Sequence, residues 1–598
     1  MIRSLWTATL LALLGCAVRK APTTAPPAAH ATSTRYCSGY RASRQGPRCI
    51  RELTAQEARQ SAFTWKLVYD QGRVVHSLWQ NGRGFMQSDD DGDVEYNFIY
   101  KEGQLVEYQA IGRTGHVRLR SVCSDNCARV DRLDAWGRPL IEDDSARVAE
   151  LRTFDANGFV REVRFIGLDG KPAKSAAGVY MHRSERDARG LELRACSFDA
   201  EGRPMLTRWG AHCVESNYDD FGNAVQVRYF DVEGKPTQNL YGVHRGQHTV
   251  DKYGNVVRTT WFGLDGKPSI SSDFPGARCT TTVAHVVDGV RVGGDCLNER
   301  DEPSPFRPGN AFWRETADEQ GRASETRWFG ADGAPVASPN FATMRYVYGE
   351  KDFVTEKRFY LADGTPGQRR GPAMTRSERG DNGLVKSELY LDARGEPSEL
   401  HGCSRRDFEW DRYRKLTALL CLDPKGRRET DEMGVSIRRF TYRNDGLLDE
   451  IRYFDTENKP ANSSDGFARS VTQYDSQGTE TCRLLYDKDN QRVMLPRFRV
   501  MRARPPYVNK EWTYGSRQLA IARLEEARRR LLAGEEFGKV AMQFSDLEVT
   551  AKRPGDDGYY KLDTVYPAVR LAVEKLRVNE VSPVVEIPAG LQLYQRIE

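Results

Sequence analysis

The chain has 598 residues, 29% of them charged, and a formal net charge of +5. This length exceeds what one hydrophobic core supports, so we expect a long body and at least one separate domain. Acidic and basic residues are interleaved throughout, which argues against nucleic acid as a partner, because that binding needs a concentrated basic face. The pattern predicts a solvated surface of mixed charge.

The first residues have the pattern of an export signal. Arg3 supplies a positive charge, residues 5–14 form a short apolar run, and Leu13-Leu14-Gly15-Cys16 follows at the expected cleavage point. The run is too short to remain as a membrane-spanning helix. We therefore assign residues 1–16 to a signal peptide.

The tetrad that ends at Cys16 resembles the lipobox of bacterial lipoproteins. The resemblance implies that Cys16 becomes the diacylated first residue of the mature chain, and Ala17 after it implies the outer membrane, on a side that stays open. An ordinary signal peptide with a cysteine there by chance is the alternative. Residues 17–34, rich in Ala, Pro and Thr, are expected to form a flexible tether.

One phrase recurs along most of the chain. It reads D-D-F-G-N-A-V-Q-V-R-Y-F-D-V-E-G-K-P at Asp219–Pro236, other copies begin at Asp155, Asp251 and Asp318, and a worn copy ends at Pro460. The first glycines of four copies lie 32 residues apart, at Gly158, Gly190, Gly222 and Gly254. A fixed period of this length indicates a repeat architecture.

Each copy predicts an antiparallel hairpin. In Asp-x-x-Gly the aspartate caps its own turn and the glycine accepts a positive φ. Runs such as 225–230 place β-branched or aromatic residues at alternate positions, which suits a half-buried strand. The second turn ends in a proline that cannot donate to a ladder. Because one hairpin is marginal alone, residues 35–495 are expected to stack as a mainly β repeat body.

Cysteine spacing predicts disulfides, which export would permit. Three pairs are separated by 17 or 18 residues and suggest one recurring staple: Cys196 with Cys213, Cys279 with Cys296, and Cys403 with Cys421. Cys37 with Cys49 and Cys123 with Cys127 complete five bridges, leaving Cys482 over. A zinc site at 123–127 is rejected, because paired C-x-x-C units or nearby histidines are missing.

The body also offers candidate binding groups. Its aromatic residues could form a sugar-binding or peptide-binding surface, but a stacked core at one phase of the repeat is the preferred interpretation. These residues include Trp79, Trp209, Trp261, Trp328, Phe165, Phe262 and Phe329. The turn aspartates could bind calcium, yet one Asp per turn more often caps that turn. His244 and His248 would suit a metal only on a helix, so we expect no metal and no cofactor.

The turns resemble the YD repeats of the RHS family. Only the Y-D-x-x-G-N/R phrase matches, as at 69–73 and 218–223. The resemblance implies a β architecture and carries no function with it.

The repeat phrase stops near Leu495, and residues 496–598 have a different pattern. The predicted elements are a strand over 496–504, a helix from Ser516 to Gly534, a helix over 536–546, a turn at Gly555 and Gly558, a helix over 567–576, and strands over 581–586 and 591–597. Apolar residues three or four positions apart, at Ala520, Leu524, Ala527 and Leu531, lie on one face of the first helix, Ser516 can cap it, and Gly534 ends it. The order β-α-α-β-α-β-β describes a compact α+β domain.

Three segments of this domain resemble the PpiC, or parvulin, family of peptidyl-prolyl cis-trans isomerases. They are L-L-A-G-E-E-F-G-K-V-A-M-Q-F-S-D at 531–546, A-K-R-P-G-D-D-G-Y-Y at 551–560, and N-E-V-S-P-V-V-E-I-P-A-G-L-Q-L-Y at 579–594. The spacing between all three also agrees, over about one sixth of the chain. The resemblance implies a parvulin fold and rotation about X-Pro bonds, whose barrier is near ~20 kcal/mol.

The family's polar network of two histidines, a cysteine or aspartate, and a serine or threonine is not matched here. The resemblance aligns the four positions with Pro505, Leu547, Ile587 and Gln592, and no histidine follows His401. The Met and Phe of the family's proline pocket fall on Val565 and Val569, beside Tyr559 and Tyr560. The apolar surface is therefore kept, while most of the electrostatic preorganisation is lost.

The main hypothesis is a cell-envelope lipoprotein whose parvulin-like domain binds polypeptide, nominally as an isomerase in the folding of exported proteins. Expected partners are polypeptide segments, with the membrane reached through the lipid anchor only. The alternative is a non-enzymatic structural or adhesive surface protein whose function lies in the repeats.

Overall fold

The computed structural model describes residues 32–598 with gaps. The gaps are 89–92, 142–145, 208, 240–241, 270–278, 305–309, 338–339, 350–351, 479, 504–506, 509–510, 513, 546–555, 561, 563–564 and 588–589. The expected signal segment with Cys16, most of the expected tether, and the aligned positions Pro505 and Leu547 lie outside the described residues.

The body is built from one antiparallel sheet of 31 strands, in which each strand from β5 onward pairs with the next in chain order. β1 pairs with both β4 and β5. The sheet strands are β1 (Ser33–Cys37), β4 (Glu52–Leu53), β5 (Thr64–Asp70), β6 (Arg73–Gln80), β7 (Asp93–Lys101), β8 (Gln104–Gly112), β9 (Val117–Ser124), β10 (Arg129–Leu133), β11 (Ala149–Phe154), β12 (Val160–Ile166), β13 (Met181–Arg186), β14 (Glu192–Phe198), β15 (Cys213–Tyr218), β16 (Ala224–Phe230), β17 (Arg245–Val250), β18 (Val256–Phe262), β19 (Thr281–Val287), β20 (Val290–Leu297), β21 (Phe312–Ala317), β22 (Ala323–Phe329), β23 (Thr343–Tyr348), β24 (Val354–Tyr360), β25 (Met374–Arg379), β26 (Val385–Leu391), β27 (Arg405–Trp410), β28 (Leu416–Leu422), β29 (Ile437–Tyr442), β30 (Leu448–Phe454), β31 (Arg469–Tyr474), β32 (Glu480–Tyr486) and β33 (Arg492–Val493). The predicted stack of antiparallel hairpins is confirmed.

The repeated aspartates cap their own turns, as the sequence predicts. Asp219 accepts hydrogen bonds from the backbone N–H of Asn223 at 2.8 Å, and Gly222 has a φ of +79°. In the second turn of the same unit, Asp231 accepts from the N–H of Lys235 at 2.8 Å, and Gly234 has a φ of +76°. Both turns therefore use the Asx geometry that glycine completes.

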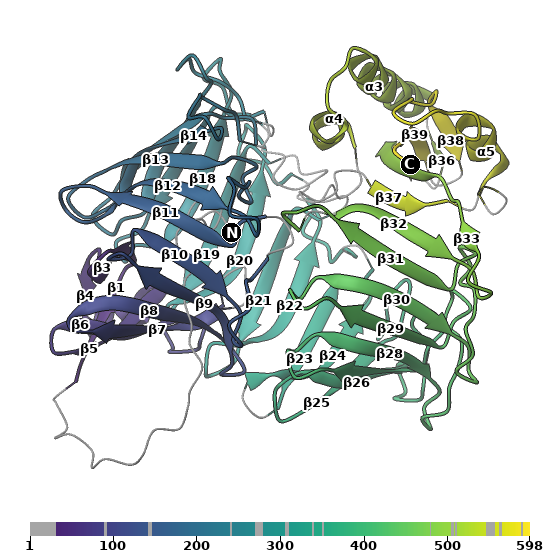
Figure 1. Cartoon of the computed structure of the whole chain (residues 1–598), viewed down its shortest axis with the longest axis horizontal. Coiled ribbons are helices and arrows are strands. Elements are labelled where there is room, and N and C mark those ends of the chain that lie inside the picture. The colour runs from purple at the N-terminus through teal and green to yellow at the C-terminus, as the bar shows by residue number, and fades with distance from the viewer. Residues whose placement is uncertain are drawn as a thin grey trace.

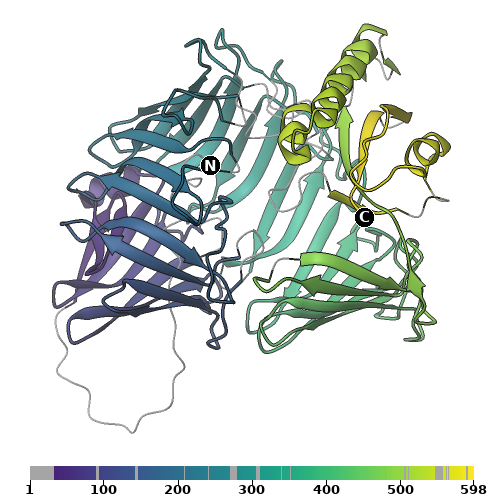
Figure 2. The ribbon, with the colours of Figure 1, turned by 45° about the horizontal axis from the view of Figure 1, so that its top comes forward.

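The sheet curls so that its early strands lie beside much later ones, as Figures 1 and 2 show. Each turn of the curled sheet is called a coil here. Three hydrogen bonds illustrate the contact between successive coils. The amide of Ala62 donates to Asn255 Oδ1 at 2.7 Å, Asn81 Nδ2 donates to the carbonyl of Gly321 at 3.0 Å, and Gln477 Nε2 donates to the carbonyl of Pro172 at 3.1 Å. Asn255, Gly321 and Gln477 all belong to Asp-x-x-Gly turns, so this row of turns rests on the preceding coil.

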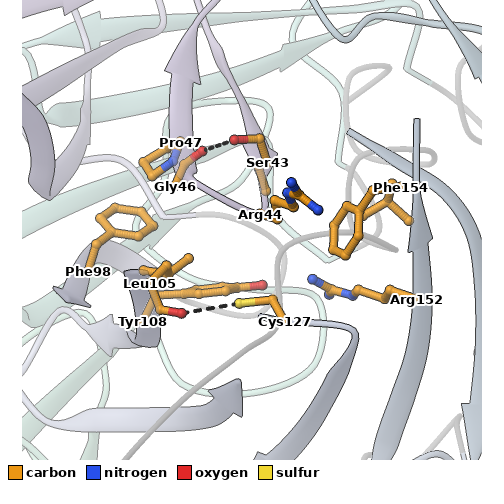
Figure 3. A pocket seen from close by; sticks show the side chains of 12 residues that line it. Ser43, Arg44, Gly46, Pro47, Phe98, Leu105, Tyr108, Cys127, Arg152 and Phe154 are labelled. Carbon is orange, nitrogen blue, oxygen red and sulfur yellow. Dashed lines mark hydrogen bonds between the residues drawn. The ribbon is translucent and has the colours of Figure 1, made fainter. Parts of the chain in front are cut away.

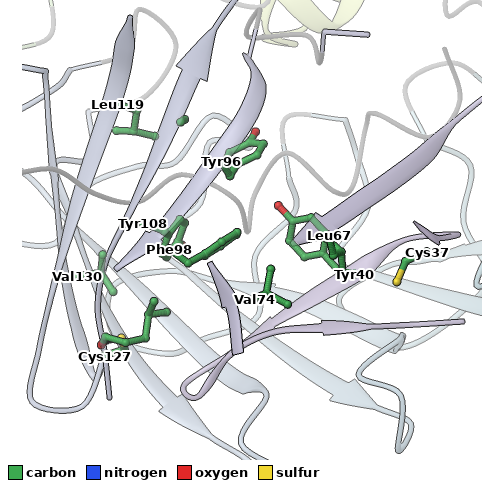
Figure 4. Packing of buried hydrophobic residues seen from close by; sticks show 12 residues of the cluster. Cys37, Tyr40, Leu67, Val74, Tyr96, Phe98, Tyr108, Leu119, Cys127 and Val130 are labelled. Atoms are coloured by element: carbon green, nitrogen blue, oxygen red, sulfur yellow. Dashed lines mark hydrogen bonds between the residues drawn. The ribbon is translucent and has the colours of Figure 1, made fainter. Parts of the chain in front are cut away.

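The N-terminal end of the body has its own compact core. A small hairpin, β2 (Tyr40–Ser43) and β3 (Gly46–Cys49), and the helix α2 (Ala55–Gln60) lie on the first strands. Tyr40 contacts Phe98 edge to face at 6.2 Å between ring centroids, within a buried cluster that also contains Leu67 and Tyr108 (Figure 4). The hairpin thus adds a second layer to this part of the sheet.

All five expected disulfides are present. Cys37 is joined to Cys49, Cys123 to Cys127, Cys196 to Cys213, Cys279 to Cys296, and Cys403 to Cys421. Cys196 and Cys213 lie directly opposite each other on β14 and β15, so this bridge links consecutive hairpins. Cys482 is the free cysteine among the described residues.

The aromatic residues of the repeats do not all share one core, which corrects the expectation of a single phase. Trp261 is 7% exposed, and Phe165 is fully buried. Phe262 follows Trp261 and points to the other face of the strand, where the guanidinium of Arg245 lies 4.2 Å from its ring centroid. The repeat therefore buries some rings and leaves others under arginine side chains.

The C-terminal domain has the predicted order of elements. Its strands and helices are β34 (Arg497–Ala503), β35 (Tyr507–Val508), β36 (Glu511–Trp512), α3 (Tyr514–Leu532), α4 (Phe537–Phe544), β37 (Asp556–Tyr559), α5 (Pro567–Val573), β38 (Val585–Ile587) and β39 (Gly590–Arg596). The four-stranded sheet has the order β37-β34-β39-β38 and is antiparallel. Within the described residues, none of the helices combines the length and apolar character needed to cross a membrane.

Several boundaries in this domain differ from the prediction. Gly558 lies inside β37 rather than in a turn, the third helix ends at Val573, and the first closing strand is reduced to Val585–Ile587. The short pair β35 and β36 was not predicted at all. Such short strands leave too few residues for alternation to be visible in the sequence.

The domain rests on the last hairpins of the body. Tyr559 packs among Leu485, Tyr453 and other apolar residues of the body, and its hydroxyl donates to Glu598 Oε2 at 2.8 Å. Arg497 Nη1 lies 3.7 Å from Glu480 Oε1 across the same junction. β34 therefore starts directly from the end of the repeat sheet.

Candidate peptide-binding site of the C-terminal domain

Two central strands position the candidate site. β34 and β39 are antiparallel neighbours, with Val500 opposite Tyr594 and Arg502 opposite Gln592. Directly opposite residues of an antiparallel pair point to the same face of the sheet. Arg502 and Gln592 therefore share a face, and it is the face covered by α5 rather than by α3 and α4.

The apolar part of this face is a buried cluster. Val569 on α5 is 2% exposed and Ile587 on β38 is 8% exposed, and both pack with Phe498 and Tyr594. Val565 lies partly buried against the same cluster. The structure thus brings together three of the residues singled out for peptide contact or aligned with the family network.

Aromatic rings extend the cluster. Tyr560 meets Phe498 edge to face at 5.2 Å and Tyr594 at 6.0 Å between ring centroids. Burial raises the pKa of both tyrosines, and a nearby carboxylate, Asp557, raises it further. Both hydroxyls therefore stay protonated and can act as hydrogen-bond donors at neutral pH.

The polar groups form two short chains. Tyr594 donates its hydroxyl to the side-chain oxygen of Gln592, which is 3% exposed. Asp557 accepts from the hydroxyl of Tyr560 and from Arg502 Nη2 at 3.3 Å. The backbone N–H of Arg502 also donates to Ser545 Oγ at 3.2 Å, which ties β34 to the end of α4.

Arg502 is the residue that the sequence analysis missed. It stands opposite Gln592, the position that the resemblance aligns with the family's second histidine, whereas Pro505, aligned with the first, lies outside the described residues. The alternation of Phe498, Val500 and Arg502 along one strand was the available signal. An arginine stays protonated throughout, so it donates hydrogen bonds but does not exchange a proton at neutral pH.

Tyr559 lies away from this face. Its ring belongs to the apolar junction with the repeat body, and burial, with the nearby Glu598, raises its pKa to about 12. The structure therefore separates Tyr559 from Tyr560, although the two are adjacent in sequence, because they lie at the end of a strand with opposite orientations.

The candidate histidines of the body each contact a different neighbour. His244 Nδ1 lies 3.1 Å from the carbonyl of Thr237, whereas His248 Nδ1 lies 2.8 Å from Thr259 Oγ1, so the two histidines have separate partners. His212 lies near Cys196 and Cys213, but those sulfurs are joined to each other. A disulfide does not supply the thiolates that a metal would bind.

A small cavity lies beneath the N-terminal hairpin. It is lined by Phe98, Tyr108, Arg152 and Phe154 among others, as Figure 3 shows, and its volume is about 10 Å³. A cavity of this size holds about one water molecule. It is a packing defect of the core rather than a ligand site.

Comparisons with known proteins assign the C-terminal part of the chain. The Rotamase family, described as the PPIC-type PPIASE domain, matches residues 507–598. Among curated proteins, no match is found. The chain therefore carries a PpiC-type domain at its C-terminus, with the helices and sheet described above.

Solved structures match the two parts separately. The solution structure of TbPIN1 is 24% identical over 17% of this chain and 96% of the other, with a TM-score of 0.15. Peptidyl-prolyl isomerase ESS1 from Candida albicans is 24% identical over 17% of this chain and 62% of the other, also with a TM-score of 0.15. The crystal structure of TcdB2-TccC3-TEV is 10% identical with a TM-score of 0.32; the match covers 71% of this chain but only 23% of that one.

Proposed function

We propose that this chain is a cell-envelope lipoprotein whose PpiC-type domain binds segments of exported polypeptide and has little or no isomerase activity. The observation that supports the proposal is Gln592, which replaces the family's second histidine according to the resemblance, contacts Tyr594 of the apolar cluster and stands opposite Arg502. This pair keeps hydrogen-bond donors beside an apolar surface but supplies no imidazole.

The physical argument separates binding from catalysis. Rotation about a prolyl bond requires stabilisation of a twisted amide against a barrier near ~20 kcal/mol, and preorganised polar groups supply part of it. Here Arg502 is held by Asp557, and the Gln592 oxygen is held by Tyr594. Val565, with the cluster around Val569, still offers apolar contact to an extended chain.

The compartment is inferred from covalent chemistry. Five disulfides in one chain are typical of an oxidising environment, such as the bacterial periplasm or the cell surface. The lipobox-like tetrad at Cys16 supports anchoring to the outer membrane. A role in the folding of exported proteins would follow from that location.

The second candidate function lies in the repeat body. The body makes up most of the chain and offers a long, rigid surface, which favours a structural or adhesive role with the C-terminal domain as a cap. In that case the full chain and a chain without residues 496–598 would bind the peptide equally well, or neither would bind it.

The test uses the full chain and a fluorescent, unstructured, proline-containing peptide. We expect anisotropy to show binding that falls by about 5- to 150-fold for Val565→Ser, because the variant puts a hydroxyl on the apolar surface at a cost of about 1–3 kcal/mol. Val578→Ser is the matched control, since Val578 is 53% exposed and lies outside the cluster. Equal weakening by both variants would contradict the assignment of this face.

The catalytic part of the proposal has its own assay. Refolding of a proline-limited substrate should proceed at the same rate with and without substoichiometric full chain. Pro505→His combined with Gln592→His tests the missing imidazoles, and a gain of activity would support the argument. Clear acceleration by the unaltered chain would overturn it.

A further inference from the structure

One face of the body carries a row of arginines on consecutive strands. We call it the arginine row, and its members are Arg314 on β21, Arg327 on β22, Arg345 on β23, Arg358 on β24 and Arg376 on β25. Within it, Arg314 lies directly opposite Arg327, and Arg345 lies directly opposite Arg358. Like charges in such positions are destabilising, so their repetition calls for an explanation.

Carboxylates shared between strands hold the row together. Glu325 accepts from Arg327 and from Arg345 Nε at 2.5 Å. Glu356 accepts from Arg358 Nε at 2.5 Å and from Arg376 Nε at 2.7 Å. Each carboxylate therefore bridges two guanidinium groups, which fixes the arginine side chains in advance of any ligand.

The carboxylates lie beneath the arginines. The side chains of Glu325 and Glu356 are 12% and 9% exposed, whereas those of Arg327, Arg345 and Arg358 are 53%, 51% and 48% exposed. With Asp295, which binds Arg314 at 2.6 Å, the row has five guanidinium groups and three carboxylates. Glu378, two residues after Arg376 on β25, is exposed on the same face, so the excess over these strands is one positive charge, and solvent meets mainly the guanidinium groups of Arg327, Arg345 and Arg358.

The opposite face of these strands is occupied by the chain itself. Phe341, in the connection between β22 and β23, packs on Trp328 at 5.4 Å and on Phe359 at 4.8 Å between ring centroids. On the arginine face, rings lie beside the guanidinium groups: Arg345 is 4.7 Å from the centroid of Tyr360, and Arg314 is 4.9 Å from that of Phe312. The arginine face thus combines fixed cations with partly exposed rings.

We propose that the arginine row binds a linear acidic polysaccharide. Carboxylate groups of such a chain match the forked geometry of guanidinium, and the rings offer apolar area to a sugar face. Successive carboxylate bridges lie two strands apart, or about 10 Å at the usual strand spacing.

The same arrangement recurs elsewhere on the body. Glu450 accepts from Arg452 and from Arg469 Nε at 2.8 Å, and Glu162 accepts from Arg164 Nε at 2.8 Å and from Arg183 Nε at 2.7 Å. These copies extend the same chemistry along the sheet. A long, regularly spaced polymer would engage more of them than a small anion.

The experiment titrates polygalacturonate into the full chain by calorimetry at low salt, with uncharged dextran as the ligand control. The test variant is Arg327→Gln with Arg358→Gln, which leaves Glu325 and Glu356 one arginine each. We expect affinity to fall on the order of 30-fold, since a basic side chain near an anionic surface contributes about fivefold. Binding by the unaltered chain should weaken as salt rises.

The matched control is Arg203→Gln with Arg427→Gln. These arginines are 72% and 78% exposed, and each pairs with a turn aspartate outside the arginine row. The control therefore removes the same two positive charges as the test variant, but not from the row. Thermal unfolding is recorded for both variants to show that each is folded. Equal loss of affinity in both, or no binding of polygalacturonate by the unaltered chain, would overturn the proposal. An oligodeoxynucleotide that binds as tightly would overturn the choice of a polysaccharide.

Discussion

The contact between coils can be tested at Gly222. Its φ is +79°, and a Cβ added there would lie 2.7 Å from Ile50 Cγ2, on the segment that follows the N-terminal hairpin. Gly234, in the second turn of the same unit, has a φ of +76° and no atom within 4 Å of an added Cβ. Gly222→Ala and Gly234→Ala therefore strain the backbone alike, but only the first pushes on Ile50.

The structure gives the size of the difference. A left-handed backbone costs a residue other than glycine about 1–2 kcal/mol, and this applies to both variants. Overpacking against Ile50 adds about 1–3 kcal/mol to Gly222→Ala alone. The same turn is also held by Arg51, whose guanidinium lies 3.8 Å from the ring centroid of Phe221. Displacing the turn should therefore loosen the N-terminal segment as well.

Hydrogen exchange of the full chain, read by mass spectrometry, separates the two effects. We expect Gly222→Ala to raise exchange in the hairpin β2–β3 and in the turn itself, while Gly234→Ala raises it only near its own turn. If both variants leave β2–β3 equally protected, the contact between coils contributes nothing measurable and the reasoning is wrong.

Three further predictions concern covalent bonds and charge. Cys196→Ser with Cys213→Ser should lower the stability of the hairpins it joins by about 3 kcal/mol, as expected for the 17-residue separation, and proteolysis between β14 and β15 should quicken; unchanged cleavage would contradict this. Burial alone would raise the pKa of Glu356, but hydrogen bonds from Arg376 and Arg358 lower it below the usual value. The stability that Glu356 adds to the folded state is therefore present above the unfolded pKa of about 4.3 and is lost as pH falls through the lower folded pKa. An acid titration of tryptophan fluorescence should show a smaller acid-induced loss for Glu356→Gln, and identical curves would refute the assignment. Cys16→Ala should move the protein from the membrane fraction to the soluble fraction of cells, and retention would argue against lipidation.

Local chemistry let the sequence determine much of this fold. An aspartate that caps its own turn and a glycine with positive φ act within a few residues. Asp219 and Gly222 therefore predict their turn whatever its position in the tertiary structure. The cysteine spacing predicted the disulfide between Cys196 and Cys213 for the same reason, because 17 residues span one connection between hairpins. In the C-terminal domain, helix ends and apolar periodicity were readable, while strands as short as Val585–Ile587 were not.

Only the tertiary structure decided which distant residues meet. Gly222 and Gly234 look alike in the sequence, yet only the first faces Ile50, because the curvature of the whole sheet brings an earlier coil to it. Arg502 faces Gln592 through a register between strands that are far apart in the chain, and no pattern within either strand fixes that register. The arginine row arises in the same way, since alternation assigns each arginine to a face, but cross-strand pairing alone sets the guanidinium groups beside a shared carboxylate.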